Sequence, residues 1–297
     1  MPSYLVTGAS RGLGYGMIKV LASDPLNKVI GLVRDATSTR ARLSADNISN
    51  VHIVAADITD DKALREAAEE TKRFLGDAGL DVLINNAAYV SKATELKNFK
   101  DFEHDVPAVL EDTQRSFEIN VVGVLKTIFA FLPLVREGKL KKIVGISSGM
   151  GDIGKSADYI VAQDTPNDGY EAGVSANFIP EFINSLKLAN AAPYAVSKAA
   201  LTTMFTKFNA AYQDEGLLFF TICPGLVDTA EGDATLSSDD TLRLQAIMAK
   251  FNDYAPGFKA MDPVTAAESS LAAVARSTLE TGHGGSFLSH NGTKRWM

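Results

Sequence analysis

The chain opens with a glycine-rich stretch that decides its fold, Thr7-Gly8-Ala9-Ser10-Arg11-Gly12-Leu13-Gly14, directly after a short apolar run at residues 4–6. Glycines at these positions predict a tight turn from a strand into a helix, because glycine permits positive φ and close backbone approach. The first amide groups of that helix would face an anion such as a dinucleotide pyrophosphate. A plain strand-to-helix turn could carry the same glycines, but its position after the first strand favours dinucleotide binding.

Composition and charge narrow the class of protein. The 297 residues are 46% hydrophobic and 22% charged, as in a soluble globular protein, and they suffice for one large α/β domain or two small ones. The formal net charge of −7 argues against a nucleic-acid partner, because phosphate binding needs clustered Lys and Arg. Neither an internal disulfide nor a metal site is expected, since Cys223 is the one cysteine and the four histidines lack ligand spacing.

The same features predict a reduced, cytoplasmic protein. The first apolar run follows Met1-Pro2 so closely that no signal peptide fits before it. No apolar run is expected to span a membrane, so no membrane partner is predicted.

Strand-like apolar runs alternate with helical patterns along the chain. The expected strands are residues 4–6, 28–33, 51–55, 81–84, 142–146, 217–222 and 285–288. The expected helices are residues 12–23, 60–75, 107–137, 194–214 and 263–279. Short, continuously apolar strands are typical of a parallel sheet that is covered on both faces. We therefore predict an α/β fold: a single doubly wound Rossmann-type domain over residues 1–297, with helices on both faces of a sheet of about seven parallel strands.

Two irregular regions interrupt this alternation, residues 149–192 and residues 226–260. Each follows the carboxyl end of an expected strand, where ligands bind in doubly wound sheets. We expect both to form walls or lids of a substrate site.

The end of the second expected strand, residues 32–34, bears on the choice of dinucleotide. NAD sites usually carry an acid about 20 residues beyond the glycine turn. Here Arg34 offers a planar, charged fork that suits a 2′-phosphate, and Arg11 could reach the same phosphate. Alternatively, Arg34 pairs with Asp35 or Asp57 at the surface. We expect NADPH or NADP+ rather than the NAD pair.

A tyrosine and a lysine at a spacing of four residues suggest proton transfer. Tyr194 and Lys198 follow Pro193 on an expected helix, so they share one face. A neighbouring ammonium favours the phenolate, and it would lower the tyrosine pKa from its reference value of about 10. Tyr15 and Lys19 have the same spacing inside the first helix, and we expect that pair to be structural.

The ordered set of motifs resembles the short-chain dehydrogenase/reductase superfamily over nearly the whole chain. Residues 85–88, Asn-Asn-Ala-Ala, are similar to its Asn-Asn-Ala-Gly motif, with Ala88 in place of glycine. Residues 224–229, Pro-Gly-Leu-Val-Asp-Thr, are similar to its loop on the nicotinamide side. The resemblance implies a catalytic tetrad of Asn120, Ser148, Tyr194 and Lys198. Ser147 is the alternative to Ser148.

The resemblance also implies a function. It predicts an NADP(H)-dependent oxidoreductase, a carbonyl reductase or ketoreductase, that reduces a ketone or aldehyde. Tyr194 would supply the proton, Ser148 would bind the carbonyl oxygen, Lys198 would hold the ribose, and Asn120 would position a water. The implied cofactor contacts are Gly8, Ser10, Arg11, Gly12, Leu13, Gly14, Arg34, Asp57, Ile58, Asn86, Ala87, Asn120, Tyr194, Lys198, Pro224, Gly225, Val227 and Thr229. The alternatives are alcohol oxidation with NADP+ and a non-catalytic dinucleotide sensor.

One departure concerns the 46 positions that separate Ser148 from Tyr194, a distance much longer than is usual in the family. An insertion at this place resembles monomeric carbonyl reductases and some fungal ketoreductases. We expect its apolar residues to cover the helical surface that forms dimers elsewhere in the family, which favours a monomer over a dimer or tetramer. A flap over the substrate is the alternative. These apolar residues are Phe178, Phe182, Ile183 and Leu186.

Overall fold

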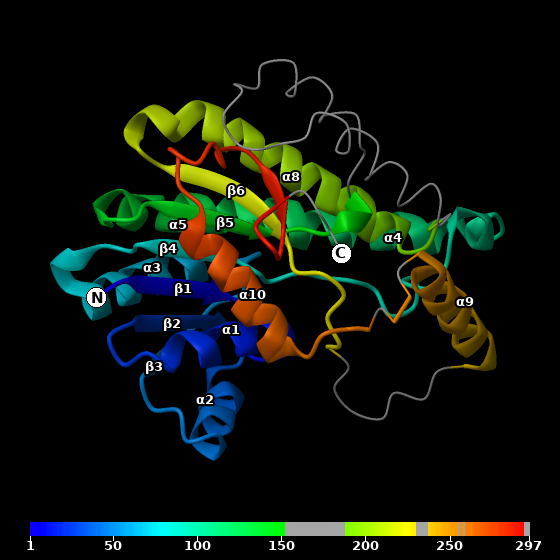
Figure 1. Ribbon diagram of the computed structural model, residues 1–297, viewed down its shortest axis with the longest axis horizontal. Helices are drawn as coiled ribbons and strands as arrows, with labels where there is room; N and C mark the ends of the chain where they lie inside the picture. The colour runs from blue at the N-terminus through cyan, green and yellow to red at the C-terminus, as the bar shows by residue number, and fades with distance from the viewer. Residues whose placement is uncertain (152–187, 230–236, 255, 258, 294–297) are drawn as a thin grey trace.

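Seven parallel strands form one sheet in the order β3-β2-β1-β4-β5-β6-β7, which is the middle layer of the fold (Figure 1). The computed structural model describes residues 1–151, 188–229, 237–254, 256–257 and 259–293. The strands are β1 (Ser3–Thr7), β2 (Lys28–Val33), β3 (Val51–Ala55), β4 (Val82–Asn85), β5 (Lys142–Ile146), β6 (Leu218–Cys223) and β7 (Phe287–Ser289). All seven expected strands are present, with ends displaced by one or two residues, so the predicted parallel sheet is confirmed.

Strand order reverses between β1 and β4, which lie side by side although two strands separate them in the sequence. The chain builds outward from β1 to β3, returns to β4, and then builds outward in the other direction. In such sheets a crevice opens at the carboxyl ends of the strands where the order reverses. The glycine turn after β1 and the segments after β4 and β5 therefore meet at one place.

Helices cover both faces of the sheet, as expected (Figure 1). Alternate residues of a strand point to opposite faces, so Leu5 joins one apolar core and Val6 joins the other. Helices α1 (Gly12–Ala22), α2 (Ala36–Ala45) and α10 (Pro263–Arg276) contribute to the core that contains Val6. Helices α3 (Asp61–Leu75), α5 (Val124–Glu137) and α8 (Ala192–Tyr212) contribute to the core that contains Leu5.

Two helices were not expected from the sequence. Helix α2 buries only Thr39 and Leu43, so its apolar pattern is weak, and it begins where the Asp35 carboxylate accepts a hydrogen bond from the Ser38 amide at 3.0 Å. Helix α9 (Ser238–Tyr254) lies inside the region 226–260 that was expected to be irregular. None of its residues whose burial is described is buried. The expectation of irregular structure was wrong there, because helix periodicity is visible in a sequence only where a face is buried.

The expected helix at 107–137 consists of three parts: α4 (Val106–Phe117), a π-helical turn at Glu118–Gly123, and α5. By length and composition alone, the run Val106–Glu137 could cross a membrane, contrary to the expectation from the sequence. Half of its most apolar window is buried inside the fold, where α5 packs against α3 and α4 packs against α8. Core packing accounts for the buried half of that apolar window.

Buried polar groups at the amino-terminal edge of the sheet hold neighbouring segments together. The Asp81 carboxylate accepts hydrogen bonds from the backbone amides of Ser3, at 2.9 Å, and Lys139, at 2.7 Å. The Lys142 ammonium donates to the carbonyl oxygens of Val274, at 2.9 Å, and Ala275, at 3.1 Å, at the end of α10. These groups lie opposite the crevice and serve the fold.

Parts of two predicted regions fall outside the residues that the structure describes. These are residues 230–236, 255 and 258 of the region 226–260 and residues 152–187 of the expected insertion at 149–192, including the apolar residues Phe178, Phe182, Ile183 and Leu186. Among the described residues, no group of three or more His, Cys, Asp or Glu side chains could hold a metal ion.

Candidate active site

The glycine turn leaves no room for side chains. A Cβ atom on Gly14 would lie 2.4 Å from the Gly8 carbonyl oxygen, and one on Gly8 would lie 2.8 Å from the Ala87 Cα. Gly8 and Gly12 have φ of +67° and +52°. No side chain caps the N-terminus of α1, and its first turn holds no acid. Backbone amides and the positive end of the helix dipole therefore face the crevice, an arrangement that fits a pyrophosphate.

Thr7 ties the segment after β4 to this turn. Its hydroxyl oxygen accepts hydrogen bonds from the amides of Asn86, at 3.1 Å, and Ala87, at 3.0 Å, while the Asn86 side chain donates to the Thr7 carbonyl at 2.9 Å. Ala88, which replaces the motif's glycine, has an ordinary backbone conformation. Among the described non-glycine residues, positive φ is confined to Asn47, Lys141 and Ala191.

The ends of β2 and β3 place Arg34 near Asp57. Partial burial works to raise the pKa of the Asp57 carboxyl, but hydrogen bonds from Thr59, and then the charge of Arg34, hold it below its usual range. The nearby Asp35 carboxylate caps α2. Within the part of the chain that the structure describes, the exposed Arg34 guanidinium forms no ion pair, so it is available to an anion.

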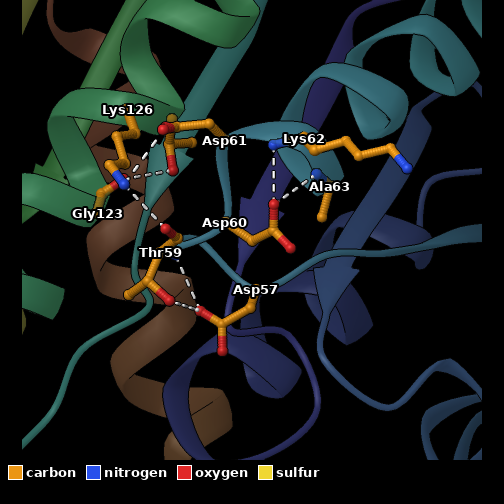
Figure 2. A network of polar contacts seen from close by, with 9 residues as sticks. Asp57, Thr59, Asp60, Asp61, Lys62, Ala63, Gly123 and Lys126 are labelled. Carbon is orange, nitrogen blue, oxygen red and sulfur yellow. Dashed lines mark hydrogen bonds and ion pairs between the residues drawn. The ribbon is translucent and has the colours of Figure 1, made fainter.

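A polar network fixes the loop that carries Asp57 (Figure 2). The Asp57 carboxylate accepts from the Thr59 amide at 2.9 Å and from its hydroxyl at 2.8 Å. The Lys126 ammonium of α5 donates to the Thr59 carbonyl at 2.9 Å and lies 3.4 Å from the Asp61 carboxylate. Asp60 caps the first amides of α3. The loop is thus held to both helices, which places Asp57 and the buried Ile58 after β3.

The segment after β6 returns to the glycine turn. Gly225 has φ of +80°, and Val227 pairs with Met261 in an isolated parallel bridge. The Thr229 methyl group lies 3.2 Å from the position that a Cβ on Gly12 would occupy. The predicted cofactor contacts Pro224, Gly225, Val227 and Thr229 therefore belong to one segment that ends against the glycine turn.

Tyr194 lies in the first turn of α8, and the Ser148 side chain is close enough to influence its phenol. Burial raises the pKa of this phenol to about 12; the proximity of Cys223 adds to that rise, and the nearby Ser148 hydroxyl opposes it. The predicted lowering of the tyrosine pKa by Lys198 is therefore not found. The reason is where the ammonium points: it donates to the Ile146 carbonyl at 2.6 Å and lies 5.6 Å from the centre of the Tyr194 ring.

Lys198 is buried one turn further along the helix. Burial lowers the pKa of its ammonium from 10.5 to about 8, since the charged form loses its hydration, while the proximity of Cys223 works to raise it. At neutral pH the phenol is thus protonated and most of the lysine is charged. The pair joins a proton donor to a nearby cation.

The two adjacent serines have different surroundings. The buried Ser147 hydroxyl donates to the Lys198 carbonyl at 3.2 Å and lies 2.8 Å from the Thr202 hydroxyl, so it serves the packing of α8 against β5. The Ser148 hydroxyl accepts from the Met150 amide at 3.2 Å and contacts the Tyr194 phenol. The geometry favours Ser148 as the partner of Tyr194.

Asn120 lies in the π-helical turn and is fully buried. Its amide oxygen accepts from the Tyr89 amide at 2.7 Å, and its nitrogen donates to the Tyr89 carbonyl and to the Ser197 hydroxyl, both at 2.9 Å. The side chain thus joins the segment after β4 to the helix of Tyr194. π-Helical turns are frequent at functional sites. The predicted role of Asn120 in holding a water stays a prediction.

Several residues at the site were not predicted from the sequence. Cys223 ends β6; its sulfur accepts from the Gly149 amide at 3.2 Å, and it lies near both Tyr194 and Lys198. Its place beside the serine turn follows from the pairing of β5 with β6, which a parallel sheet suggests but a single sequence does not fix. Tyr89 and Ser197 carry no motif signal, because their part is to orient Asn120.

The second tyrosine–lysine pair, Tyr15 and Lys19, makes contacts that join two helices. The Tyr15 hydroxyl donates to the Asp46 carboxylate at 3.0 Å, and the Lys19 ammonium lies 3.2 Å from the same carboxylate. The Arg42 guanidinium lies 4.1 Å from the centre of the Tyr15 ring. These groups join α1 to the end of α2, away from Ser148.

An apolar cavity of about 220 Å³ lies beside the first turns of α8. Phe99, Met150, Leu188, Ala192 and Val196 contribute to its lining. Its α8 residues, Ala192, Ala195 and Val196, do not share the helix face of Tyr194 and Lys198, and neither Ser148 nor Tyr194 contributes to its lining. Its lining suits an apolar body rather than a charged one.

Comparisons with known proteins agree with this geometry. The family model for short chain dehydrogenases matches residues 3–159. The short-chain dehydrogenase/reductase AacuF of Aspergillus aculeatus is 41% identical over 302 residues, covering 100% of both chains, and the short chain dehydrogenase virK of Hypocrea virens is 34% identical over 300 residues, also covering 100% of both. The NADPH-bound carbonyl reductase from chicken fatty liver has the same fold, with a TM-score of 0.69, 21% identity, and coverage of 99% of this chain and 98% of that one. The chain belongs to the short-chain dehydrogenase/reductase family and is an oxidoreductase with a Rossmann-type fold.

Proposed function

We propose that this protein is an NADPH-dependent carbonyl reductase that converts a ketone or aldehyde to an alcohol, with Tyr194 as the proton donor. The observation that carries this proposal is the position of Tyr194 in the first turn of α8, near the Ser148 hydroxyl, with the Lys198 ammonium buried one turn away and 5.6 Å from the centre of the Tyr194 ring. The two hydroxyl groups would bind the carbonyl oxygen of a substrate, with the cation close by. An NADPH-bound carbonyl reductase among proteins of this fold supports the same reaction class.

The residues present fit a dinucleotide. The glycine turn and the uncapped start of α1 would hold the pyrophosphate, and Lys198 would hold the nicotinamide ribose. When bound, the reduced nicotinamide supplies a hydride to the carbonyl carbon. Arg34 and Arg11, both exposed, would face the 2′-phosphate.

Three observations support NADPH over NADH. The residue at the end of β2 is the buried Val33, where an NAD site would carry an acid. The next carboxylate, Asp35, is engaged as the cap of α2 and is followed by no other acid in that turn. Arg34 forms no ion pair with any described residue and retains its fork for a phosphate.

The protonation states favour reduction. With its pKa near 12, the Tyr194 phenol is protonated at neutral pH and can give its proton to the oxygen of the reduced substrate. Ser148 would donate a hydrogen bond to that oxygen as negative charge develops, and a preorganised donor of this kind contributes roughly 3 kcal/mol. The phenolate that remains then recovers a proton from solvent.

We propose a small or medium apolar ketone or aldehyde as the substrate, with its carbonyl group at Ser148 and Tyr194. This proposal rests on the resemblance to carbonyl reductases, because the apolar cavity beside α8 is lined by neither of those residues.

Two other functions remain to be separated from this one. Oxidation of an alcohol with NADP+ uses the same groups in reverse, and a dinucleotide sensor would bind cofactor without turnover. Purified protein should be assayed with NADPH and, in parallel, NADH on a panel of diketones and aldehydes. Steady NADPH oxidation supports the proposal; turnover only with alcohols and NADP+ would favour the reverse reaction, and cofactor binding without turnover on either panel would favour a sensor.

A further inference from the structure

The imidazole of His290 lies against the segment that follows β6. Strand β7 pairs with β6 at the edge of the sheet, with Ser289 opposite Cys223, so the residues that follow these two strands are neighbours (Figure 1). A Cβ atom on Gly225 would lie 3.2 Å from His290 Nδ1 and 3.3 Å from Cε1. The ring therefore supports the predicted nicotinamide-side loop, residues 224–229, from the side of β7.

The loop has several supports, and His290 is one of them. The Met261 methyl group also approaches Gly225, to 2.7 Å from the place that a Cβ would occupy. The Met261 amide donates to the Leu226 carbonyl at 2.9 Å, and the Asp228 amide donates to the Met261 carbonyl at 2.8 Å. Of the two side chains that lie against Gly225, only that of His290 can take up a proton.

One ring nitrogen of His290 is buried without a partner. Its Nδ1 is shielded from solvent and forms no hydrogen bond with any described residue, although the side chain as a whole is only partly buried. Burial lowers the pKa of the imidazole below its ordinary value of 6.5. The ring is therefore neutral at pH 7 and carries its proton on Nε2, because an N–H at Nδ1 would be buried without an acceptor.

A second histidine beside β7 provides a contrast. His283 precedes the strand, and burial lowers the pKa of its imidazole as well. Its Nδ1, however, lies 3.0 Å from the Ser277 hydroxyl, which can accept a hydrogen bond from a protonated ring. His283 can thus gain a proton without leaving an N–H unpaired, whereas His290 cannot do so in its place against Gly225.

Burial, rather than a neighbouring charge, is what keeps His290 neutral. The Arg276 guanidinium donates to the Asn291 carbonyl at 3.2 Å, and the Asp262 carboxylate caps the first amides of α10. The charged or titratable side chains on the elements packed against the ring are Cys223, Asp228, Asp262 and Arg276, while Lys294 and Arg295 lie outside the described residues.

We propose that His290 is a positioning residue for the nicotinamide-side loop, which holds the loop in place as a neutral ring and releases it when the ring is protonated. A second proton would place an N–H at Nδ1, against Gly225 and without an acceptor, together with a charge that burial disfavours. The charged ring is favoured only where it reaches water, which requires separation from Gly225.

The sign of the pH dependence follows by linkage. The pKa of His290 is lower in its place against the loop than in a freely hydrated ring, so the closed arrangement is fully stable above pH 6.5. It is weakened as the pH falls below that value. The consequence for cofactor affinity rests on the proposed function, but the behaviour of the loop does not.

Hydrogen exchange of the cofactor-free protein tests the contact itself. Protection of peptides from residues 224–229 should be compared at pH 7.5 and pH 5.5, after correction for intrinsic exchange rates. One pH unit below the reference pKa of about 6.5, linkage allows opening to be favoured by up to about tenfold. We expect wild-type protection of the loop to fall about three- to tenfold at pH 5.5, while that of β4 stays unchanged. Equal protection of the loop at both pH values would overturn the proposal.

Substitutions assign the effect to one residue. His290→Gln does not titrate, and His290→Phe keeps an aromatic ring against Gly225, so each should lose the pH dependence of loop protection; either variant suffices if the other fails to fold. His283→Gln is the matched control and should keep the wild-type pH dependence. A pH dependence that persists in the His290 variants, or one that disappears in His283→Gln, would contradict the assignment.

Cofactor binding tests the consequence at the site. The Kd for NADP+ should be measured at the same two pH values, because NADPH decomposes in acid. Protonation of the 2′-phosphate, with a pKa near about 6, weakens binding to every variant alike, so the informative quantity is the ratio of the wild-type Kd to that of His290→Gln. This ratio should rise about three- to tenfold from pH 7.5 to pH 5.5.

An unchanged Kd ratio, together with pH-dependent loop protection, would overturn the role of His290 in cofactor positioning. Failure of NADP+ to bind either protein at pH 7.5 would instead count against the proposed function. The exchange experiment would still decide whether His290 holds the loop.

Discussion

The Lys198 ammonium donates a 2.6 Å hydrogen bond to the carbonyl oxygen of Ile146, two residues before Ser148. This contact ties the helix that carries Tyr194 to the end of the strand that presents Ser148. It also places the cation where burial lowers its pKa to about 8, while the pKa of the Tyr194 phenol rises to about 12. The site thus holds a protonated donor and a cation that is lost at moderately alkaline pH.

The pH dependence of the reaction follows from these two groups. Lys198 is protonated below its pKa and neutral above it, so the cation that would hold the nicotinamide ribose disappears as the pH rises through about 8. We expect kcat/KM for carbonyl reduction in the free enzyme to be flat near pH 7 and to fall above about pH 8. A profile measured from pH 6 to 10 checks this. Activity that stays level through pH 10 would contradict the assigned role of Lys198.

Cofactor preference is expected to depend on Arg34. Arg34→Asp removes a cation and adds a carboxylate next to the 2′-phosphate of NADPH. The ratio of kcat/KM for NADPH to that for NADH should fall at least tenfold, equivalent to about 1.4 kcal/mol. Arg136→Asp, a substitution on the far side of the protein, serves as the control for net charge. Equal efficiency of wild type with NADH would refute the preference itself.

Stability is expected to depend on the buried Asp81. Asp81→Ala leaves the buried amide of Ser3 and the partly buried amides of Lys139 and Leu140 without their acceptor. Unsatisfied buried groups of this kind cost about 1–3 kcal/mol, so urea unfolding should show a loss of that size or more. Activity of the folded fraction should be retained. The exposed Asp77 provides the comparison, and an equal loss in Asp77→Ala would show that burial of Asp81 is not the cause.

A monomer is the expected assembly. Exposed apolar side chains on α4 and α5, among them Leu110 and Phe129, are 56% and 53% exposed in the structure and would favour a dimer if no other segment covered them. We expect the inserted residues between Ser148 and Tyr194 to cover them. Light scattering at micromolar concentration should give a mass near 31.7 kDa. A stable mass of twice or four times that value would overturn this expectation.

The sheet could be predicted because its strands are buried on both faces and so read as continuous apolar runs, as Lys28–Val33 does after its first residue. The glycine turn could be predicted because Gly8 and Gly14 meet backbone atoms that no side chain could clear. The spacing of Tyr194 and Lys198 was visible for the same local reason, since residues four apart share a helix face.

What depends on distant contacts could not be predicted. Helix α9 lacks a buried face, and one of its contacts joins Arg243 to Asp101, far away in the sequence. The direction of the Tyr194 pKa shift depends on burial and on which carbonyl accepts the hydrogen bond of Lys198. The local sequence specifies neither of these. The place of Cys223 at the site follows from the pairing of β5 with β6, which the sequence alone does not fix.

The central claim is that Tyr194 gives the proton, and a pair of tyrosine variants tests it most directly. Tyr194→Phe removes the phenolic proton but keeps the ring, whereas Tyr15→Phe removes a hydroxyl that donates to Asp46, away from Ser148. NADPH oxidation with a carbonyl substrate should be measured together with NADPH binding for both. The account predicts that Tyr194→Phe loses turnover but binds NADPH nearly as wild type, and that Tyr15→Phe stays active. Sustained turnover in Tyr194→Phe, with activity lost in Tyr15→Phe, would contradict it.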